Sequence, residues 1–223
     1  MTALGRPRLH LRETDSTNER ARALALGGAP HGTLVTASAQ TAGRGREGRR
    51  WEAAPGSSLL CSLVLRRVDE LLPLRAGLAV ADLAGEAARV KWPNDVLVAG
   101  RKVAGVLVEA RPQDGWAALG IGVNLAAAPP ALGERAGALG RTDSEAALSE
   151  LLAALAVRLA EPAATALEAL RGRDALLGEH VEWADGAGVG DGIDDGGGLR
   201  VRLESGEHVV LSTGEVHLAA QLG

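Results

Sequence analysis

Apolar and polar residues follow one another along this chain in patterns that predict strands in some segments and helices in others. Alternation at 8–12 predicts an edge strand, and apolar runs bounded by turn residues predict strands at about 33–38, 58–66 and 116–124. Residues 96–98 and 102–109 flank Ala99-Gly100 and predict a hairpin. Apolar residues spaced three and four apart predict helices at 71–88, 143–160 and 163–173. Ser16-Thr17-Asn18-Glu19 has the form of a capping box, so a helix is also predicted from there to Gly27.

This order of elements predicts an α+β fold with a mixed, largely antiparallel sheet and helices inserted between groups of strands. After residue 176 the pattern changes to short strands at 180–183, 199–203 and 207–211, separated by Asp-Gly and Ser-Gly turns. We therefore expect a larger domain at 1–175 and a small β-barrel at 176–223. Residues 126–141 contain Pro129-Pro130 and several glycines, which predicts a long mobile loop.

Composition and charge narrow the class of protein. A formal net charge of −4 and a sequence pI near 5.8 argue against general affinity for nucleic acid. There is no Phe or Tyr, so the core is expected to consist of Leu, Val and Ala with four Trp. The single cysteine, Cys61, lies in an apolar run and is expected to be a buried hydrophobe rather than a nucleophile. Without a signal peptide or an apolar span of about 20 residues, a cytoplasmic location away from the membrane is expected.

Cations are concentrated in two short segments that contain glycine. One runs from Thr41 to Trp51 and carries four arginines; the other is Lys91-Trp92-Pro93-Asn94-Asp95, followed by Arg101 to Gly105. Arginine keeps its charge and presents a planar fork of donors that suits phosphate and carboxylate groups. An acidic chain that gathers cations in this way is predicted to bind an anion there.

The glycine–arginine segment matches the G-x-G-x-x-G string from Gly43 to Gly48, and Asp69 lies near the spacing of a dinucleotide fold's ribose acid. That fold also requires a helix beginning within the motif. Pro55-Gly56 and the strand predicted at 58–66 leave no room for one, so a Rossmann site is rejected, as is a Walker loop. We expect a disordered loop whose arginines meet a phosphate and which becomes ordered when the ligand binds. A solvated basic loop is the plainer alternative.

Five segments in order resemble the biotin protein ligase (biotin–[acetyl-CoA carboxylase] ligase) family. They are Ser16-Thr17-Asn18, Gln40 with residues 43–51, Lys91 to Asp95, Arg101 to Glu109 and Gly120 to Leu125, and Gly214-Glu215-Val216 near the end extends the likeness. The resemblance implies a catalytic domain akin to class II aminoacyl-tRNA synthetases and an SH3-like C-terminal barrel. It implies that biotin and ATP form biotinyl-5′-AMP, which then acylates a lysine of a biotin carboxyl carrier domain.

The resemblance also assigns roles to residues. Lys102, Arg46 and Asp95 would be catalytic, and Asp95 would either hold Mg²⁺ or receive the acceptor lysine. The biotin site would comprise Ser16, Thr17, Asn18, Gln40, Gly43, Arg44, Arg46, Lys102, Gly105, Gly120 and Gly122. The nucleotide site would comprise Arg46, Arg49, Trp51, Lys91, Asn94, Lys102 and Asn124. Cations and Mg²⁺ suit this chemistry because a carboxylate must approach a polyphosphate.

Plainer interpretations stand beside these roles. Ser16 and Thr17 could simply cap a helix, and Lys102 could lie in water at the hairpin end. Core packing is favoured over ligand stacking for Trp51 and Trp92, although the resemblance puts Trp51 near the nucleotide. The glycines at 105, 120 and 122 are unfavourable in strands, so a close ligand approach is expected to explain them.

The chain also departs from parts of the family. It begins at the first catalytic strand, so the DNA-binding domain of some relatives and their repressor activity are not expected. Glu47 stands where some relatives have a cation. The loop after Asn124 has no Trp to cover an adenine, and Leu132 or Leu139 is the suggested substitute.

Three other functions compete with biotin ligation. A lipoate ligase or octanoyltransferase shares the catalytic fold, but the Gly-Arg-Gly-Arg loop and the terminal barrel favour biotin. A non-enzymatic biotin sensor is opposed by the presence of both Lys102 and Asp95. An RNA-binding module is opposed by the net acidity and the scarcity of aromatic residues. The sequence leaves open the acceptor carboxylase and the oligomeric state, for which a homodimer is one option.

Overall fold

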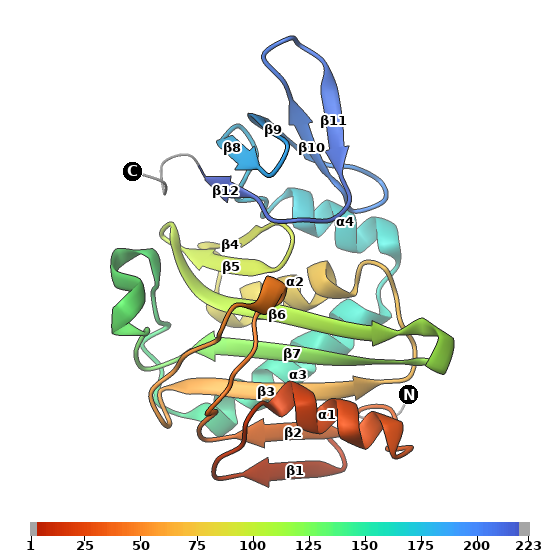
Figure 1. The fold of residues 1–223 in the computed structure, drawn as a ribbon, viewed down its shortest axis with the longest axis vertical. Helices are drawn as coiled ribbons and strands as arrows, with labels where there is room; N and C mark the ends of the chain where they lie inside the picture. Colours follow the sequence, from red (N-terminus) through yellow and green to blue (C-terminus); the bar gives the residue numbers. More distant parts are fainter. Residues whose placement is uncertain (1–3, 219–223) are drawn as a thin grey trace.

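The computed structural model describes residues 4–218, which fold into two sheets with helices on both faces of the larger one (Figure 1). The α-helices are α1 (Thr17–Leu26), α2 (Leu72–Ala84), α3 (Ser144–Ala160) and α4 (Ala163–Arg171). The strands are β1 (Arg8–Leu11), β2 (Leu34–Ala37), β3 (Ser58–Leu65), β4 (Ala88–Lys91), β5 (Asp95–Val98), β6 (Arg101–Arg111), β7 (Trp116–Asn124), β8 (His180–Trp183), β9 (Gly186–Ile193), β10 (Leu199–Arg202), β11 (His208–Leu211) and β12 (His217–Leu218). No helix within residues 4–218 is long and apolar enough to cross a membrane.

The larger sheet has seven strands in the order β1-β2-β3-β7-β6-β5-β4. All of its neighbouring strands are antiparallel except β1 and β2, which are parallel. The predicted mixed, largely antiparallel α+β fold is therefore confirmed. This pairing also agrees with the rejection of a Rossmann fold, which requires a parallel sheet.

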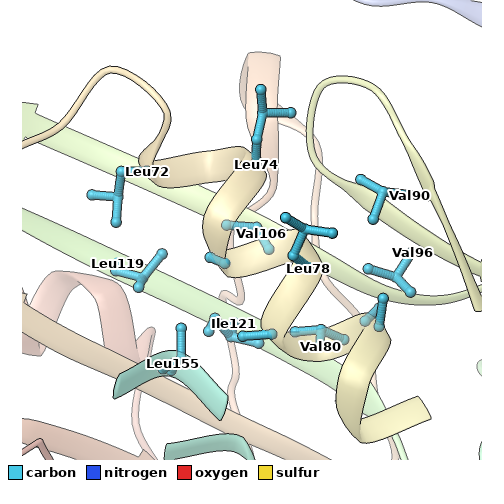
Figure 2. Close-up of a cluster of buried hydrophobic side chains, with 14 of the residues drawn as sticks. Leu72, Leu74, Leu78, Val80, Val90, Val96, Val106, Leu119, Ile121 and Leu155 are labelled. Atoms are coloured by element: carbon cyan, nitrogen blue, oxygen red, sulfur yellow. The ribbon is translucent and has the colours of Figure 1, made fainter. Parts of the chain in front are cut away.

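Alternation along the central strands sends side chains to two different layers. On β3, Leu59, Cys61, Leu63 and Leu65 join the main core, whereas Val64 packs in a smaller cluster with Ala21 and Ala25 of α1. Helices α2 and α3 cover the main-core face, where Leu78 and Leu155 approach Leu119 and Ile121 of β7 (Figure 2). Each buried Leu or Val contributes about 1.5–3 kcal/mol relative to exposure. Cys61 is buried, as predicted, and burial raises the pKa of its thiol to about 12.

Two elements differ from the sequence prediction. Helix α2 ends at Ala84 and not near residue 88, because Gly85 takes a φ of 99° there and the following residues form β4. Strand β9 was not predicted, because its sequence is rich in glycine. A Cβ at Gly188 would lie 2.6 Å from the Arg202 carbonyl oxygen, and one at Gly190 would lie 2.0 Å from that of Leu176. Close backbone approach therefore explains a strand of such low propensity.

The C-terminal sheet, residues 180–218, has five strands in the order β11-β10-β9-β8-β12, all antiparallel. It lies beside the β4–β5 edge of the larger sheet (Figure 1). Trp92, 3% exposed, joins the two parts by donating from Nε1 to the Gly197 carbonyl at 3.0 Å. Core packing was the favoured role for Trp92, and the structure confirms it.

Candidate active site

A pocket opens on the face of the larger sheet opposite α2 and α3. Its floor comes from β3, β6 and β7, one wall from the start of α1, and its cover from the loop after β2. The lining includes most of the predicted site residues: Ser16, Thr17, Asn18, Gln40, Arg44, Arg46, Arg49, Trp51, Asn94, Asp95, Lys102, Gly105, Gly120 and Gly122. Segments far apart in sequence thus meet around a cavity of about 110 Å³.

The floor of the pocket is made of glycines because the protein's own side chains approach it closely. Gly105 and Gly122 are directly opposite each other on β6 and β7. A Cβ on Gly122 would lie 2.5 Å from Trp51 Cε2, and one on Gly105 would lie 3.1 Å from Trp51 Cζ3. A Cβ on Gly120 would lie 2.7 Å from Asn18 Oδ1. Neighbouring side chains therefore require these glycines even without a ligand, which corrects the expectation that a ligand alone explains them.

The start of α1 forms a polar wall joined to β3. Ser16 caps the helix by accepting from the Asn18 backbone N–H at 3.2 Å, so the capping role is confirmed. Thr17 donates to Gln40 Oε1 from its backbone at 2.7 Å and from its hydroxyl at 3.1 Å, and accepts from Ser62 at 2.9 Å. Neutral donors and acceptors thus gather at this end of the pocket.

The predicted capping box is only half formed. Glu19 does not turn back to the helix start; its carboxylate pairs with Arg22 and Arg44 instead. Asn18 is buried beside it and donates from Nδ2 to Glu109, while its Oδ1 has no hydrogen-bond partner among residues 4–218. A polar atom left without a partner in the pocket lining is a natural contact for a ligand donor.

Lys102 lies inside the pocket and is not a free lysine at a hairpin end. Its Nζ is 2.6 Å from Asp95 Oδ1 and 5.9 Å from the centre of the Trp51 ring, and its side chain is 33% exposed. The interpretation of Lys102 as a solvated lysine is therefore wrong. Trp51 is half-buried and covers the glycine floor, so the preference for core packing at Trp51 is also wrong.

The glycine–arginine loop is folded over the pocket and its arginines have partners. Arg44 pairs with Glu19 and lies 3.2 Å from Glu109; Arg49 pairs with Glu215. Arg46 has a weaker contact, from Nη1 to Asn94 Oδ1 at 3.4 Å.

The loop backbone was expected to be disordered. In the structure it forms a short 3-10 turn at Arg46–Gly48, in which Glu47 has a φ of 53°, and the described chain between β2 and β3 contains no α-helix, as predicted. The sequence reasoning missed this turn because three residues carry too weak a pattern.

Three predicted residues lie outside the pocket lining. Lys91 is largely buried, and burial lowers the pKa of its ammonium group. Asn124 is buried, accepts from Ser58 at 3.5 Å and donates to the Gly137 carbonyl at 3.0 Å, so it holds the loop after β7. A Cβ on Gly43 would lie 2.3 Å from the Trp51 carbonyl oxygen, so the close approach of the loop backbone requires glycine at this position.

The loop after β7 contains the two residues that were suggested to cover an adenine. Leu139 packs against the core, whereas Leu132 is 43% exposed on the short turn η3 (Pro130–Arg135). Neither lines the pocket. Of the two suggested residues, only Leu132 remains free of the core.

Two acidic residues at the site were missed by the sequence reasoning. Glu109 supports Asn18 and Arg44 from the far part of β6, and Glu215 lines the pocket from the segment before β12. Both lie in segments that were quoted for the family resemblance. The sequence alone did not indicate that these two carboxylates belong to the site, because only the fold brings them close to the arginines.

The pocket offers few ligands for a metal ion. Its carboxylates are Glu47, Asp95 and Glu215, and no group of three or more His, Cys, Asp or Glu side chains within residues 4–218 could hold an ion. Asp95 already faces Lys102 at 2.6 Å. Such a donor set suits only an ion that brings most of its ligands with its substrate, as Mg²⁺ does with phosphates.

Comparison with known proteins agrees with this geometry. Residues 11–125 match the biotin/lipoate A/B protein ligase family. The chain is 38% identical to a biotin–[acetyl-CoA-carboxylase] ligase of Paracoccus denitrificans, over 90% of this chain and 96% of that protein. It is 36% identical to one from Mycobacterium tuberculosis, over 92% of this chain and 86% of that protein.

The fold is also similar to that of a solved structure, the biotin protein ligase from Aquifex aeolicus in complex with biotin and ATP. The TM-score is 0.83 at 28% identity, covering 96% of this chain and 100% of that one. The mixed sheet and the cation-lined pocket on it thus define a ligase of the kind that joins a small carboxylic acid to a protein. The chain belongs to the biotin/lipoate A/B protein ligase family, and the two full-length relatives described above are biotin ligases.

Proposed function

We propose that this protein uses ATP to attach biotin to a specific lysine of a biotin carboxyl carrier domain of the acetyl-CoA carboxylase type, through biotinyl-5′-AMP. The observation that carries the proposal is that one pocket combines two kinds of group. Neutral hydrogen-bonding side chains come from the start of α1 and Gln40, and cations come from the loop after β2 and from Lys102 of β6. A neutral ureido ring next to a carboxylate and a phosphate matches this combination.

The polar wall is proposed to hold the biotin ring. Ser16, Thr17 and Gln40 supply hydroxyl and amide groups, and Asn18 Oδ1 is left without a partner among residues 4–218. Trp51 covers Gly105 and Gly122 on the floor, and the ring would bind beside the indole. These neutral groups would recognise the biotin ring by its shape and its hydrogen-bonding pattern, and they do not require the ring to be charged.

The cations are proposed to drive the first step. A carboxylate oxygen of biotin attacks the α-phosphorus of ATP, a new P–O bond forms, and the bond to the β-phosphate breaks to release pyrophosphate. Lys102 would lie between the two anions, and Arg46 and Arg49 would offset the phosphate charge. Arg44 would close the loop over the product, while Lys91 and Asn94 would support the nucleotide end.

The second step requires a neutral amine. The acceptor lysine attacks the acyl carbon of the anhydride, an amide forms, and AMP leaves. Asp95, which pairs with Lys102 in the pocket, would either receive that lysine and its proton or serve as one protein ligand for Mg²⁺. When bound, Mg²⁺ would be held mainly by the ATP phosphates and would supply further charge neutralisation.

Finer features of the architecture are proposed on the same basis. Residues 1–175 would form a catalytic domain akin to class II aminoacyl-tRNA synthetases, and residues 176–223 an SH3-like barrel. The five antiparallel strands of the C-terminal sheet support the second assignment. Cytoplasmic action on the carrier protein, without DNA binding, remains part of the proposal.

The experiment is to incubate the protein with ATP, labelled biotin or lipoate, and the apo carrier domain of each matching enzyme class. Biotin transfer to the biotin carrier alone is expected, and transfer of lipoate to its carrier would refute the proposal.

Lys102→Ala is expected to abolish adenylate formation while leaving the unfolding temperature near that of the wild type. Arg101→Ala, an exposed cation on the same strand, is the matched control and should retain activity. Pyrophosphate release at the wild-type rate from Lys102→Ala would contradict the assigned role.

A further inference from the structure

We propose that Glu215, which the C-terminal sheet contributes to the pocket, is a positioning residue that holds Arg49 in the nucleotide-free protein and releases it to the phosphates of ATP. This inference rests on the proposed function, because it assigns a competitor to the nucleotide.

The backbone around Glu215 is fixed on both sides. Gly214 forms a turn with a φ of 106°, and Val216 is 1% exposed in the core. His217 lies opposite Glu182 of β8 in the antiparallel sheet. The Glu215 carboxylate is therefore presented to the pocket by ordered chain. Its side chain is only 28% exposed although it is charged.

The partners of Glu215 are cations of the proposed nucleotide end. Its Oε2 accepts a hydrogen bond from Arg49 Nη2, and its charge also acts on Lys91. His217 Nε2 is 3.8 Å from the same oxygen. A carboxylate placed among cations occupies the electrostatic position that a phosphate group would take, and it carries less charge than the triphosphate does.

Arg49 is free to change partners. Its side chain is 57% exposed and belongs to the loop over the pocket, whereas Glu215 belongs to the ordered chain before β12. When the polyphosphate arrives, the arginine can rotate toward it and leave the carboxylate. ATP therefore has to displace Glu215, and the contact lowers the apparent affinity for ATP without touching biotin.

The size of the effect follows from the exposure of the pair. A partly exposed ion pair of this kind changes an equilibrium by about two- to fivefold and is weakened by salt. Glu215→Gln is thus expected to lower the KM for ATP by about two- to fivefold at low ionic strength. The kcat and the KM for biotin should stay unchanged, and high salt should erase the difference.

The assay measures initial rates of carrier biotinylation against ATP concentration at saturating biotin. Glu207→Gln, which removes an exposed carboxylate of the same sheet near β11, is the matched control and should leave the KM for ATP unchanged. Equilibrium binding of the non-cleavable analogue α,β-methylene-ATP should give the same ratio between Glu215→Gln and wild type. That binding measurement does not depend on turnover.

Arg49→Gln separates the proposed contact from general charge repulsion. In that background, Glu215→Gln should have little further effect on ATP affinity, because the arginine it would release is gone. A rise in the KM for ATP, or an equal fall with and without Arg49, would overturn the proposal. If the wild type fails to biotinylate any carrier, the proposed function fails, while analogue binding still tests Glu215.

Discussion

Replacing Gly122 with alanine tests whether Trp51 is the side chain that defines the shape of the pocket. Gly122 lies in a strand outside the positive-φ region, so its backbone tolerates alanine and only the new contact matters. The added Cβ would meet Trp51 Cε2 at 2.5 Å, Nε1 at 2.8 Å and Cζ2 at 2.9 Å. Because carbon atoms prefer about 3.5–4.0 Å, the indole must move by roughly 1 Å.

The expected loss of unfolding free energy depends on whether Trp51 can move away from the added methyl group. Overpacking in a closed core costs about 1–3 kcal/mol, but Trp51 is half-buried on a loop and can swing outward. We therefore expect Gly122→Ala to lose at most about 1 kcal/mol of unfolding free energy. The loss should be larger in ligand binding, with the KM for biotin raised about five- to thirtyfold, equivalent to about 1–2 kcal/mol.

The assay compares urea unfolding and steady-state kinetics for a graded series of glycine variants. Gly105→Ala meets the same indole at 3.1 Å and should raise the KM for biotin less than Gly122→Ala does. Gly27→Ala, whose nearest atom is a carbonyl of its own helix at 3.4 Å, lies away from the pocket and serves as the control.

A second background tests the cause of the effect. With Trp51→Ala the obstructing ring is gone, so the penalty of Gly122→Ala should largely disappear. An unchanged KM for biotin in Gly122→Ala, or an equal penalty with and without the indole, would refute the reasoning that Trp51 closes the site.

Two further outcomes are expected. Arg46→Gly should release the adenylate about ten- to a hundredfold more readily and biotinylate bystander proteins, because a charge-assisted contact of roughly 1.5–3 kcal/mol is lost; a blot confined to the carrier would contradict this. Burial lowers the pKa of His31, whose Nδ1 accepts from the Arg66 backbone N–H, so this histidine favours folding when neutral. Its stabilisation should be complete above pH 6.5 and be lost as pH falls from there through the lower pKa of the folded state, and urea unfolding should show a flatter pH dependence for His31→Gln.

The sequence predicted the elements in which burial follows a simple period. Strands β3 and β7 were found because both of their faces are buried or close-packed, which leaves a continuous apolar run. Strand β4 was not predicted, because it is only four residues long and its first residue, Ala88, continued the apolar spacing of the preceding helix. Strand β9 was missed because its glycines are required by close contact with backbone segments distant in sequence, which no local pattern reveals.

The same distinction applies to the site. Ser16, Thr17 and Lys102 were predicted because each lies in a short motif that resembles the biotin protein ligase family. Glu215 could not be predicted as a pocket residue, because only the packing of the C-terminal sheet brings it to a loop 166 positions away.

The loop arginines change the expected energetics of ligand binding. The sequence suggested that they gain partners only when a phosphate arrives, so that binding would order a disordered loop. In the structure Arg44 already pairs with Glu19 and Glu109, and Arg49 with Glu215. Under the proposed function, binding would exchange carboxylates for phosphates, and the net gain per arginine would be the difference between two similar charge-assisted contacts.

Arg46 is the exception among these three arginines. Within residues 4–218 it has no carboxylate partner in ion-pair contact, and only the amide oxygen of Asn94 lies near it, at 3.4 Å. A phosphate would thus give Arg46 a new charge-assisted contact, whereas for Arg44 and Arg49 it would replace an existing contact with a carboxylate. For this reason the largest share of adenylate retention should fall on Arg46, and smaller shares on Arg44 and Arg49, which give up a carboxylate in return.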